Sequence, residues 1–351
     1  MNILVTGGCG FIGSHFIEYF LRTYPKGKVT NLDALTYAAH PDMLKHLETL
    51  APERYSFIHK DITDPTLKNW IKNTNFDALI NFAAETHVDR SILDPDSFVR
   101  TNIMGVQNLL TVAREGGNIR FVQVSTDEVY GSLNSDSPPC IETTPLDPNS
   151  PYAASKASAD LLALAGARTY KQPVLITRCT NNYGPFQFPE KLLPLLIANA
   201  LEDTAIPVYG DGKQVRDWIY VVDHCRGIDA VLQKGISGEI YNISSSGEAQ
   251  NIDVIKKVLT LLGKPHSLIS FVGDRPAHDR RYGLNSSKIR KELGWSPLFS
   301  FEEGLKITLD WYLKNTEWWK KVRGKDYFQY YQANYEKKFG SLNSAMKEVN
   351  S

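Results

Sequence analysis

Residues 3–13 read Ile-Leu-Val-Thr-Gly-Gly-Cys-Gly-Phe-Ile-Gly. The run at 3–6 predicts a short buried strand, and apolar residues at helical spacing from Phe11 to Arg22 predict a helix directly after it. Between them lie Gly7, Gly10 and Gly13. Glycine is needed where the backbone approaches a pyrophosphate at a helix N-terminus, because a side chain would block that approach. The stretch therefore predicts the first βα unit of a dinucleotide-binding sheet, although a bare βα turn can also contain three glycines.

A carboxylate follows at the place where such a fold needs one. Asp33 ends the next predicted strand, about 20 residues beyond the glycines, where it can accept hydrogen bonds from ribose hydroxyls and repel a 2′-phosphate, which favours NAD over NADP. By position, Asp61 and Ile62 follow the third strand where an adenine ring would lie, with a helix N-cap as the other interpretation of Asp61. Ala83 and Ala84 follow the fourth strand, and such small residues leave room for the nicotinamide half.

Strand and helix patterns alternate through the first half, which is typical of parallel βαβ units. Strands are predicted at 3–6, 28–33, 55–60, 78–82, 120–124 and 174–178, and helices at 11–22, about 96–114 and about 153–168. After Gly184 prolines and aromatics increase and the helical patterns shorten, which indicates a second lobe.

The expected fold is therefore α/β, with a Rossmann-type doubly wound parallel sheet and a smaller C-terminal α/β substrate lobe. The sheet domain is predicted over 1–184 and the substrate lobe over 185–340, with some exchange of chain between them. A polar tail is predicted over 341–351. The active site is expected in the cleft between the lobes.

Charge and cysteine content exclude several classes of function. Lys+Arg and Asp+Glu both number 39, so no overall basic field is available for nucleic acid or an anionic membrane. The 4 cysteines are far apart, without a CxxC pair, which favours free buried thiols in a reducing compartment over disulfides or a zinc site. No apolar run reaches about 18 residues, so no membrane span is expected. A cytoplasmic protein without a metal site is predicted.

The candidate chemistry begins with Tyr152 and Lys156, which open a predicted helix. A spacing of four puts both side chains on one face, so the ammonium can lower the pKa of the phenol and hold a nicotinamide ribose. Ser125 and Thr126 end a buried strand upstream, where a hydroxyl can contact the same substrate oxygen as the tyrosine. Together with the glycine loop, this arrangement resembles the extended short-chain dehydrogenase/reductase family.

Asp127 and Glu128 point to a second reaction. Two adjacent acids are often solvated loop charges, but these follow the expected catalytic hydroxyl at the carboxyl end of a strand, where α/β proteins place their sites. An oxidoreductase of this kind needs only the tyrosine. If Asp127 is protonated and Glu128 ionised, the pair can eliminate water from a β-hydroxy ketone.

At this point the resemblance becomes close, because ordered motifs from residue 1 to about 335 look like those of the dTDP-glucose 4,6-dehydratase family. Besides the glycine loop, they are Asp-Ala-Leu-Thr-Tyr at 33–37, Ala-Ala-Glu-Thr-His-Val-Asp-Arg-Ser at 83–91, Ser-Thr-Asp-Glu-Val-Tyr-Gly at 125–131, Tyr-Ala-Ala-Ser-Lys at 152–156, Asn-Asn-Tyr-Gly-Pro at 181–185, Phe-Pro-Glu-Lys-Leu at 188–192, Gln-Val-Arg-Asp-Trp at 214–218 and Asp-Arg-Pro-Ala-His-Asp-Arg-Arg-Tyr at 274–282. Ala277 departs from the family's usual glycine, and we expect it to be tolerated if its φ is negative.

The resemblance implies an NAD-dependent nucleotide-sugar 4,6-dehydratase, a hydro-lyase that forms a homodimer through two helices per subunit, including the helix of Tyr152. It implies that Tyr152 removes the C4 hydroxyl proton, Thr126 bonds the C4 oxygen and Lys156 holds the nicotinamide ribose. Glu128 would take the C5 proton and Asp127 would protonate the departing C6 hydroxyl.

Further binding residues are carried over from the same motifs. The cofactor set gains Phe11, Ile12, Leu35, Thr36, Thr101, Ser125 and Asn182. The substrate set contains Thr86, Thr126, Asn181, Lys191, Leu192, Pro207, Tyr209, Arg216, Asn251, Arg275 and His278. Arg216 and Arg275 suit a diphosphate, because a guanidinium offers paired donors and stays charged. Arg90 is harder to place, and can hold a helix or the partner subunit.

Three alternative readings, one of them covering two enzymes, stay open at this point. A UDP-glucose 4,6-dehydratase has similar catalytic residues, and no motif distinguishes thymine from uracil. An NAD-dependent sugar-nucleotide 4-epimerase or a UDP-glucuronate decarboxylase shares the loop, tyrosine and lysine, but an epimerase needs neither a C5 base nor a C6 acid. A non-catalytic NAD-binding regulator is a third reading, against which the retained Tyr152, Lys156 and both acids argue.

Overall fold

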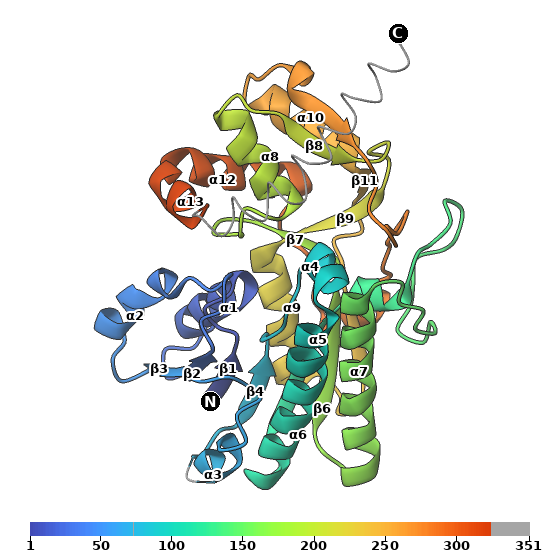
Figure 1. Ribbon diagram of the computed structural model, residues 1–351. Helices are drawn as coiled ribbons and strands as arrows, with labels where there is room; N and C mark the ends of the chain where they lie inside the picture. The colour runs from blue at the N-terminus through green and yellow to red at the C-terminus, as the bar shows by residue number, and fades with distance from the viewer. Residues whose placement is uncertain (73, 324–351) are drawn as a thin grey trace.

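The computed structural model describes residues 1–72 and 74–323 of the chain (Figure 1). Over these residues the larger sheet is seven-stranded, and every neighbouring pair in it is parallel. In sheet order its strands are β10 (Ile240–Ile243), β6 (Val174–Cys179), β5 (Arg120–Thr126), β4 (Ala78–Asn81), β1 (Asn2–Thr6), β2 (Lys28–Asp33) and β3 (Tyr55–His59). The order reverses between β1 and β4, which confirms the predicted Rossmann-type doubly wound sheet.

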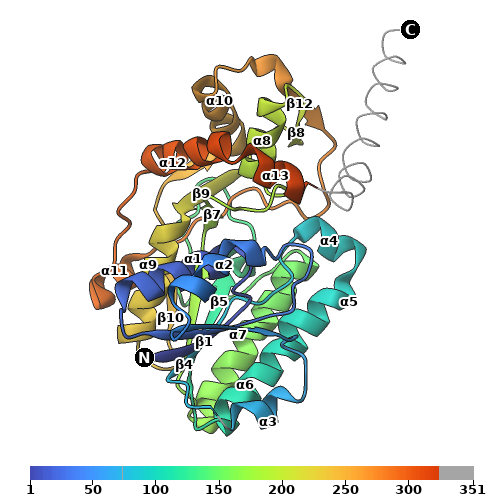
Figure 2. The same ribbon diagram turned by 90° about the vertical axis from the view of Figure 1, so that its left-hand side faces the viewer.

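Helices cover both faces of this sheet (Figure 2). On one face α1 (Phe11–Thr23) packs against α9 (Val221–Lys234), and on the other α6 (Val106–Glu115) packs against α7 (Pro151–Tyr170). Side chains of β1 alternate between the two faces, so Ile3 and Val5 join the hydrophobic cluster of α1 and α9, whereas Leu4 joins that of α6 and α7. Shorter helices complete this half: α2 (Lys45–Leu50), α3 (Leu67–Ile71), α4 (Val88–Leu93) and α5 (Pro95–Phe98).

The second lobe lies beyond the carboxyl ends of the large sheet, at the top of Figure 1. It contains two small sheets, one of β11 (Glu248–Gln250), β9 (Val215–Tyr220) and β7 (Asn181–Tyr183), the other of β12 (Ile269–Val272) and β8 (Ile206–Tyr209). Its helices are α8 (Leu192–Leu201), α10 (Asn251–Leu261), α12 (Phe301–Lys314) and α13 (Thr316–Val322).

The chain passes between the two lobes more than once. After β9 it returns to the large sheet, where α9 covers one face and β10 pairs with β6, and α11 (Ser287–Leu293) packs beside both. Residues 221–243 therefore pack against the first half of the chain, although they follow residue 184 in the sequence. The expected tail at 341–351 lies outside the described residues.

One predicted element has a different form. The helix expected as one piece over about 96–114 consists of α5, a π-helix at Val99–Gly105, and α6. A π-helical turn holds an extra residue, so it rotates the following side chains relative to an α-helix, a change that apolar periodicity does not reveal. Among the described residues, no helix combines the length and apolar character needed to cross a bilayer.

Candidate active site

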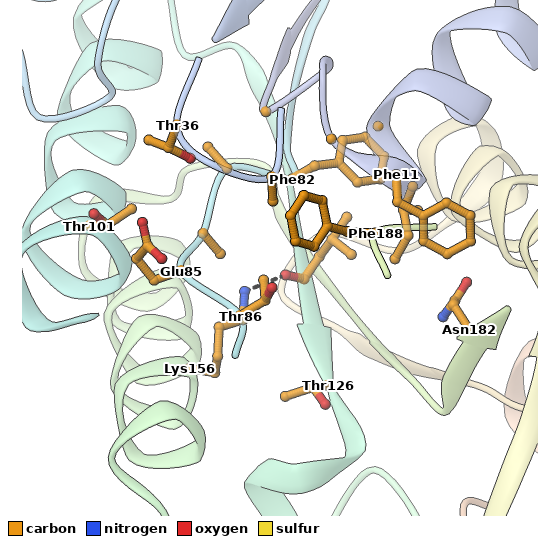
Figure 3. Close-up of a pocket in the computed structure, with 18 of the residues that line it drawn as sticks. Phe11, Thr36, Phe82, Glu85, Thr86, Thr101, Thr126, Lys156, Asn182 and Phe188 are labelled. Atoms are coloured by element: carbon orange, nitrogen blue, oxygen red, sulfur yellow. Dashed lines mark hydrogen bonds between the residues drawn. The ribbon is translucent and has the colours of Figure 1, made fainter. Parts of the chain in front are cut away.

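A cavity opens at the carboxyl ends of β1, β2, β4 and β5. Its wall is made by the glycine loop, the turns after these strands, the first turns of α7 and the segment 179–191. Figure 3 shows Thr126 and Lys156 on one side of the cavity and Phe11, Phe82 and Phe188 on another. The cavity thus lies at the edge of the sheet where doubly wound folds bind their ligands.

The glycine loop forms a cradle that has no room for side chains. Gly7 has a φ of +70°, and a Cβ added there would lie 2.5 Å from the backbone nitrogen of Ala83, while a Cβ on Gly13 would collide with the Gly7 carbonyl. Gly10 N-caps α1, and the Ser14 N–H donates to the Gly10 carbonyl at 3.0 Å. Glycine at positions 7 and 13 therefore lets the loop pack closely against the turn after β4 and against itself at the N-terminus of α1.

Asp33 joins the glycine loop to the turn after β2. The Cys9 N–H donates to its Oδ2 and the Leu35 N–H to its Oδ1, both at 2.8 Å. Burial raises the pKa of Asp33, and the two N–H donors oppose that shift. Asp33 lines the cavity, so the other lone pairs of its carboxylate are positioned to accept from hydroxyl groups. Leu35 does not line the cavity and has a φ of 53°.

A residue that sequence reasoning missed fixes the turn after β4. Asn102, in the π-helix, accepts from the Glu85 N–H at 2.9 Å and donates to the Glu85 carbonyl at 3.0 Å and to Ser155 Oγ at 2.8 Å. These bonds tie the turn that contains Ala83 and Ala84 to α7. The neighbouring Thr101 lines the cavity. The sequence offers one signal for Asn102, which is an amide side chain within an apolar helical pattern.

Thr126, Asp127 and Glu128 are oriented by a short 3-10 helix at the end of β5. The helix spans Asp127–Tyr130, and its N-cap Thr126 accepts from the Glu128 N–H at 3.3 Å. The Thr126 hydroxyl also donates to Asp127 Oδ1 at 3.1 Å, whereas Asp127 Oδ2 is buried without a hydrogen-bond partner in the described chain. Burial, followed by the charge of Glu128, raises the pKa of Asp127 to about 8. Asp127 is therefore protonated at neutral pH.

Glu128 lies in a different electrostatic environment. It is half-buried, and burial raises its pKa, but the cations Arg275, Lys191 and Arg216 oppose that shift. The positive charges stabilise the carboxylate, whereas Asp127 has a further acid as its strongest charged neighbour. The pKa of both acids is therefore raised, but cations oppose the rise at Glu128 more than at Asp127, where the charge of the other acid adds to it.

Tyr152 and Lys156 share the cavity-facing side of α7, as predicted. Ser150 caps this helix by accepting from the Ala153 N–H at 3.1 Å. The predicted lowering of the Tyr152 pKa is wrong for this structure, because burial and the charge of Glu128 raise it well above its ordinary value. The Lys156 ammonium instead donates to the Val124 carbonyl at 2.7 Å.

The predicted substrate residues divide into two groups. Thr86, Thr126, Asn181 and Lys191 line the cavity, and Lys191 Nζ donates to the Thr86 carbonyl at 2.8 Å. The others lie outside its lining, in the second lobe: Leu192 begins α8, Pro207 and Tyr209 lie on β8, Arg216 lies on β9, Asn251 begins α10, and Arg275 and His278 follow β12.

Part of the second group is linked by charge to the two predicted catalytic acids. Arg216 and Arg275 both act on Glu128, and the His278 pKa falls to about 4 through burial and the nearby Arg275. Arg216 is buried and donates to the Val215 and Asp279 carbonyls at 2.8 and 2.9 Å. Two guanidinium groups beside the cavity suit an anionic ligand.

Ala277 lies between Arg275 and His278, and its φ is not negative. Its φ is 52°, in the left-handed region that favours glycine. The condition set for its tolerance is therefore not met, and the loop 275–278 carries backbone strain.

The predicted cofactor residues line the cavity with the exception of Leu35. Those present are Gly7, Gly10, Phe11, Ile12, Gly13, Asp33, Thr36, Asp61, Ile62, Ala83, Ala84, Thr101, Ser125, Tyr152, Lys156 and Asn182. Asp61 Oδ1 also accepts from the Thr63 N–H at 2.7 Å, which fixes the turn after β3. Lining residues that were not predicted include Phe82, Glu85, Cys179, Gln187, Phe188 and Glu190.

All four cysteines are buried free thiols, as expected. Cys179 is the one at the site, where burial raises its pKa to about 12. Among the described residues, no group of three or more His, Cys, Asp or Glu side chains could hold a metal ion.

Comparison with known proteins identifies close relatives along nearly the whole chain. The family model described as GDP-mannose 4,6 dehydratase matches residues 4–308. A dTDP-glucose 4,6-dehydratase of Xanthomonas campestris pv. campestris is 49% identical over 335 residues, with 90% of this chain and 94% of that protein covered.

Solved structures agree with this match. The dTDP-glucose 4,6-dehydratase of Bacillus anthracis, in complex with NAD, has a TM-score of 0.85 and 48% identity over 92% of this chain and 99% of its own. DesIV of Streptomyces venezuelae, a dTDP-glucose 4,6-dehydratase with NAD and TYD bound, has a TM-score of 0.88 and 47% identity over 92% of this chain and 100% of its own.

Proposed function

This chain belongs to the GDP-mannose 4,6 dehydratase family, among its dTDP-glucose 4,6-dehydratases, and we propose that it converts dTDP-glucose to dTDP-4-keto-6-deoxyglucose with NAD as cofactor. The observation that carries the proposal is the contiguous set of Thr126, Asp127 and Glu128 in one cavity with Tyr152. Burial keeps one acid protonated while three cations favour ionisation of the other. Oxidation alone would need neither acid.

The residues of the cavity fit NAD. The cradle at Gly7, Gly10 and Gly13 would hold the pyrophosphate, and Asp33 would accept from ribose hydroxyls. Asp61 and Ile62 would contact the adenine, Ala83 and Ala84 the nicotinamide half, and Lys156 the nicotinamide ribose. When bound, NAD supplies a hydride acceptor for C4 of the sugar and later a hydride donor for C6.

The chain's own residues would move the protons. Tyr152 would have to lose its own proton before it removes the proton of the C4 hydroxyl, because burial raises its pKa. The Thr126 hydroxyl would turn from Asp127 to donate a hydrogen bond to the same sugar oxygen. The 4-keto group acidifies the C5 proton, which Glu128 takes and returns to C5 when the hydride is delivered to C6. Asp127, protonated at neutral pH, gives its proton to the departing C6 hydroxyl, so that water leaves.

Arg216 and Arg275 would bind the diphosphate of the substrate. Support comes from buried polar atoms without a hydrogen-bond partner in the described chain: Arg275 Nε, Asn181 Oδ1 and Asn251 Oδ1. Buried polar groups are normally paired, so these atoms are suited to a ligand. A thymidine nucleotide is proposed because the similar proteins bear that name.

Incubation of the purified protein with NAD and dTDP-glucose tests the proposal. The expected product is a 4-keto-6-deoxy sugar, recognised by its alkali-dependent ultraviolet absorption. Formation of dTDP-galactose alone would identify an epimerase instead. A kcat/KM for UDP-glucose equal to or above that for dTDP-glucose would overturn the assignment of the nucleotide, because one methyl group provides about 1–3 kcal/mol of discrimination.

We further propose that the chain acts as a cytoplasmic homodimer packed through α7 and a neighbouring helix. Apolar side chains are exposed on this face: Leu161 of α7 is 58% exposed, and Met104 and Val99 of the π-helix are 61% and 46% exposed. A large exposed apolar patch is typical of an interface. Four free thiols suit a reducing compartment.

A further inference from the structure

Two loops that line the cavity also contact each other. One follows β2 and contributes Thr36, Ala38 and Ala39 to the wall, and the other contributes 187–188 and 190–191 from the second lobe. Between them, the rings of Tyr37 and Phe188 meet edge to face with centroids 5.5 Å apart. The Tyr37 hydroxyl donates to Glu190 Oε1 at 2.9 Å.

Arg90 of α4 completes this contact from a third part of the chain. Its guanidinium lies 3.8 Å from the centroid of the Tyr37 ring, and its Nε lies 3.4 Å from Glu190 Oε2. The Glu190 side chain is 1% exposed, so its carboxylate depends on these partners rather than on water. We call Tyr37, Arg90 and Glu190 the clasp.

We propose that the clasp retains the cofactor by holding the two loops together over the cavity. Thr36 and Glu190 both line the cavity. Tyr37, the residue after Thr36, donates a hydrogen bond to Glu190 and so links the two walls. Separation of the loops therefore requires loss of the Tyr37–Glu190 hydrogen bond and of one of the two Arg90 contacts, either the cation–π contact with Tyr37 or the ion pair with Glu190. The clasp residues act by positioning the loops and have no part in the proton transfers above.

The inference rests on the proposed function, because a dehydratase of this type reduces and reoxidises one NAD within each turnover. Reduced cofactor that left after C4 oxidation would abort the cycle and leave a 4-keto sugar that still holds its C6 hydroxyl. Slow release of the cofactor is therefore part of the reaction. The clasp would provide it through residues that are not among the proposed catalytic residues.

The test compares Tyr37→Phe and Glu190→Gln with Tyr24→Phe. Tyr24 is the matched control, because its hydroxyl also donates to a carboxylate, Asp229, at 2.9 and 3.1 Å, between α1 and α9. The measurement is the rate at which excess NAD displaces a bound fluorescent etheno-NAD, without sugar present. We expect release about tenfold faster in each clasp variant, from loss of a bond to a charged group. Release within twofold of the parent rate in both clasp variants would overturn the proposal.

A double variant tests whether the residues act as one unit. Because Tyr37→Phe and Glu190→Gln weaken the same contact, the double variant should release etheno-NAD more slowly than the product of the two single effects predicts. Fully multiplicative effects would show that the residues act separately and would also overturn the clasp. The release assay contains no sugar, so the two proposals can fail separately. If the clasp proposal is wrong, the variants release etheno-NAD at the parent rate. If the proposed reaction is wrong, the protein forms no 4-keto-6-deoxy sugar, but the variants still release etheno-NAD faster.

Discussion

Asp127 has a clear proposed chemical role, and its buried position is energetically unfavourable for the ionised form of its carboxyl. The residue is 4% exposed, and the pKa of its carboxyl is about 8, against an ordinary value of 3.8. Because the folded-state pKa is raised, the stability that the neutral form provides is fully present below about pH 4 and is lost as the pH rises through about 8. The same shift that prepares the acid for catalysis therefore costs stability at neutral and alkaline pH.

Asp127→Asn should separate these two effects. The variant cannot donate the proton, so dehydration should fall by at least about a hundredfold, as for loss of a general acid. The parent loses stability between pH 5 and pH 8, because Asp127 ionises in its unfolded state but stays protonated in the folded state. The free energy of unfolding of the variant, relative to that of the parent, should therefore rise by about 1.4 kcal/mol for each pH unit in this range. Urea unfolding at both pH values measures this, and a difference independent of pH would contradict the raised pKa.

The parent enzyme should lose dehydratase activity above about pH 8, as Asp127 ionises. The rate should fall about tenfold per pH unit on that limb, since only the protonated form acts as the acid.

Glu128→Gln should stop the reaction after the first step. Tyr152 still removes the C4 proton, but no base remains for C5, so reduced nicotinamide should accumulate on the protein. The near-ultraviolet absorbance of the bound cofactor measures this after addition of dTDP-glucose. Tyr152→Phe is the matched comparison, because it impairs oxidation itself and should give little reduced cofactor. Full turnover by Glu128→Gln would remove Glu128 from the mechanism.

Ala277 offers a stability test at a single backbone position. A φ of 52° costs a non-glycine residue about 1–2 kcal/mol, of which the extra flexibility of unfolded glycine offsets about 0.5–1 kcal/mol. Ala277→Gly should therefore stabilise the protein by about 0.5–1 kcal/mol. The control is Ala230→Gly within α9, which should destabilise it by about the same amount. Urea midpoints compare the two.

At the scale of elements, α4 brings two substrate residues together. Asp89 Oδ1 lies 3.1 Å from Arg275 Nη1, and the Tyr209 hydroxyl donates to Asp89 Oδ2 at 2.8 Å. Burial is the largest single effect on the pKa of Asp89 and would raise it, but the charges of Arg275 and His87 and the hydrogen bonds from Tyr209 and Arg275 together lower the net pKa. One carboxylate of the first half thus orients β8 and the loop after β12 in the second lobe.

Asp89→Asn should weaken substrate binding more than catalysis. Without the charge, the Arg275 guanidinium is less firmly oriented towards the diphosphate, so KM for dTDP-glucose should rise about tenfold, with kcat changed by less than about threefold. Asp211→Asn is the control, because it removes an exposed ion pair with Arg280 at 2.8 Å. Steady-state kinetics decide, and an unchanged KM would mean that Arg275 is held without Asp89.

How far sequence predicts the elements depends on whether the signal is local. β1, β2 and α1 follow from apolar periodicity and glycine placement, and Thr126 to Glu128 follow from their position at a strand end. Asn102 acts through a π-helical turn, which leaves apolar spacing nearly unchanged. Tyr37, Arg90 and Glu190 meet only through tertiary packing of three segments, so no spacing in the chain indicates the clasp. The φ of Ala277 depends likewise on its loop.

At the scale of the whole molecule, α7 would connect the proposed catalysis to the proposed dimer, because Tyr152 and Lys156 of this helix line the cavity and its Leu161 is 58% exposed. Leu161→Glu would place a charge in the proposed apolar interface, which a dimer cannot bury without a partner. The molar mass in solution, by light scattering, should fall from a dimer to a monomer. Leu298→Glu, at a residue 65% exposed and remote from α7 in sequence, should leave the mass unchanged. A dimer that persists in Leu161→Glu would place the interface elsewhere, whereas a monomer with weaker activity would show that the partner supports the catalytic helix.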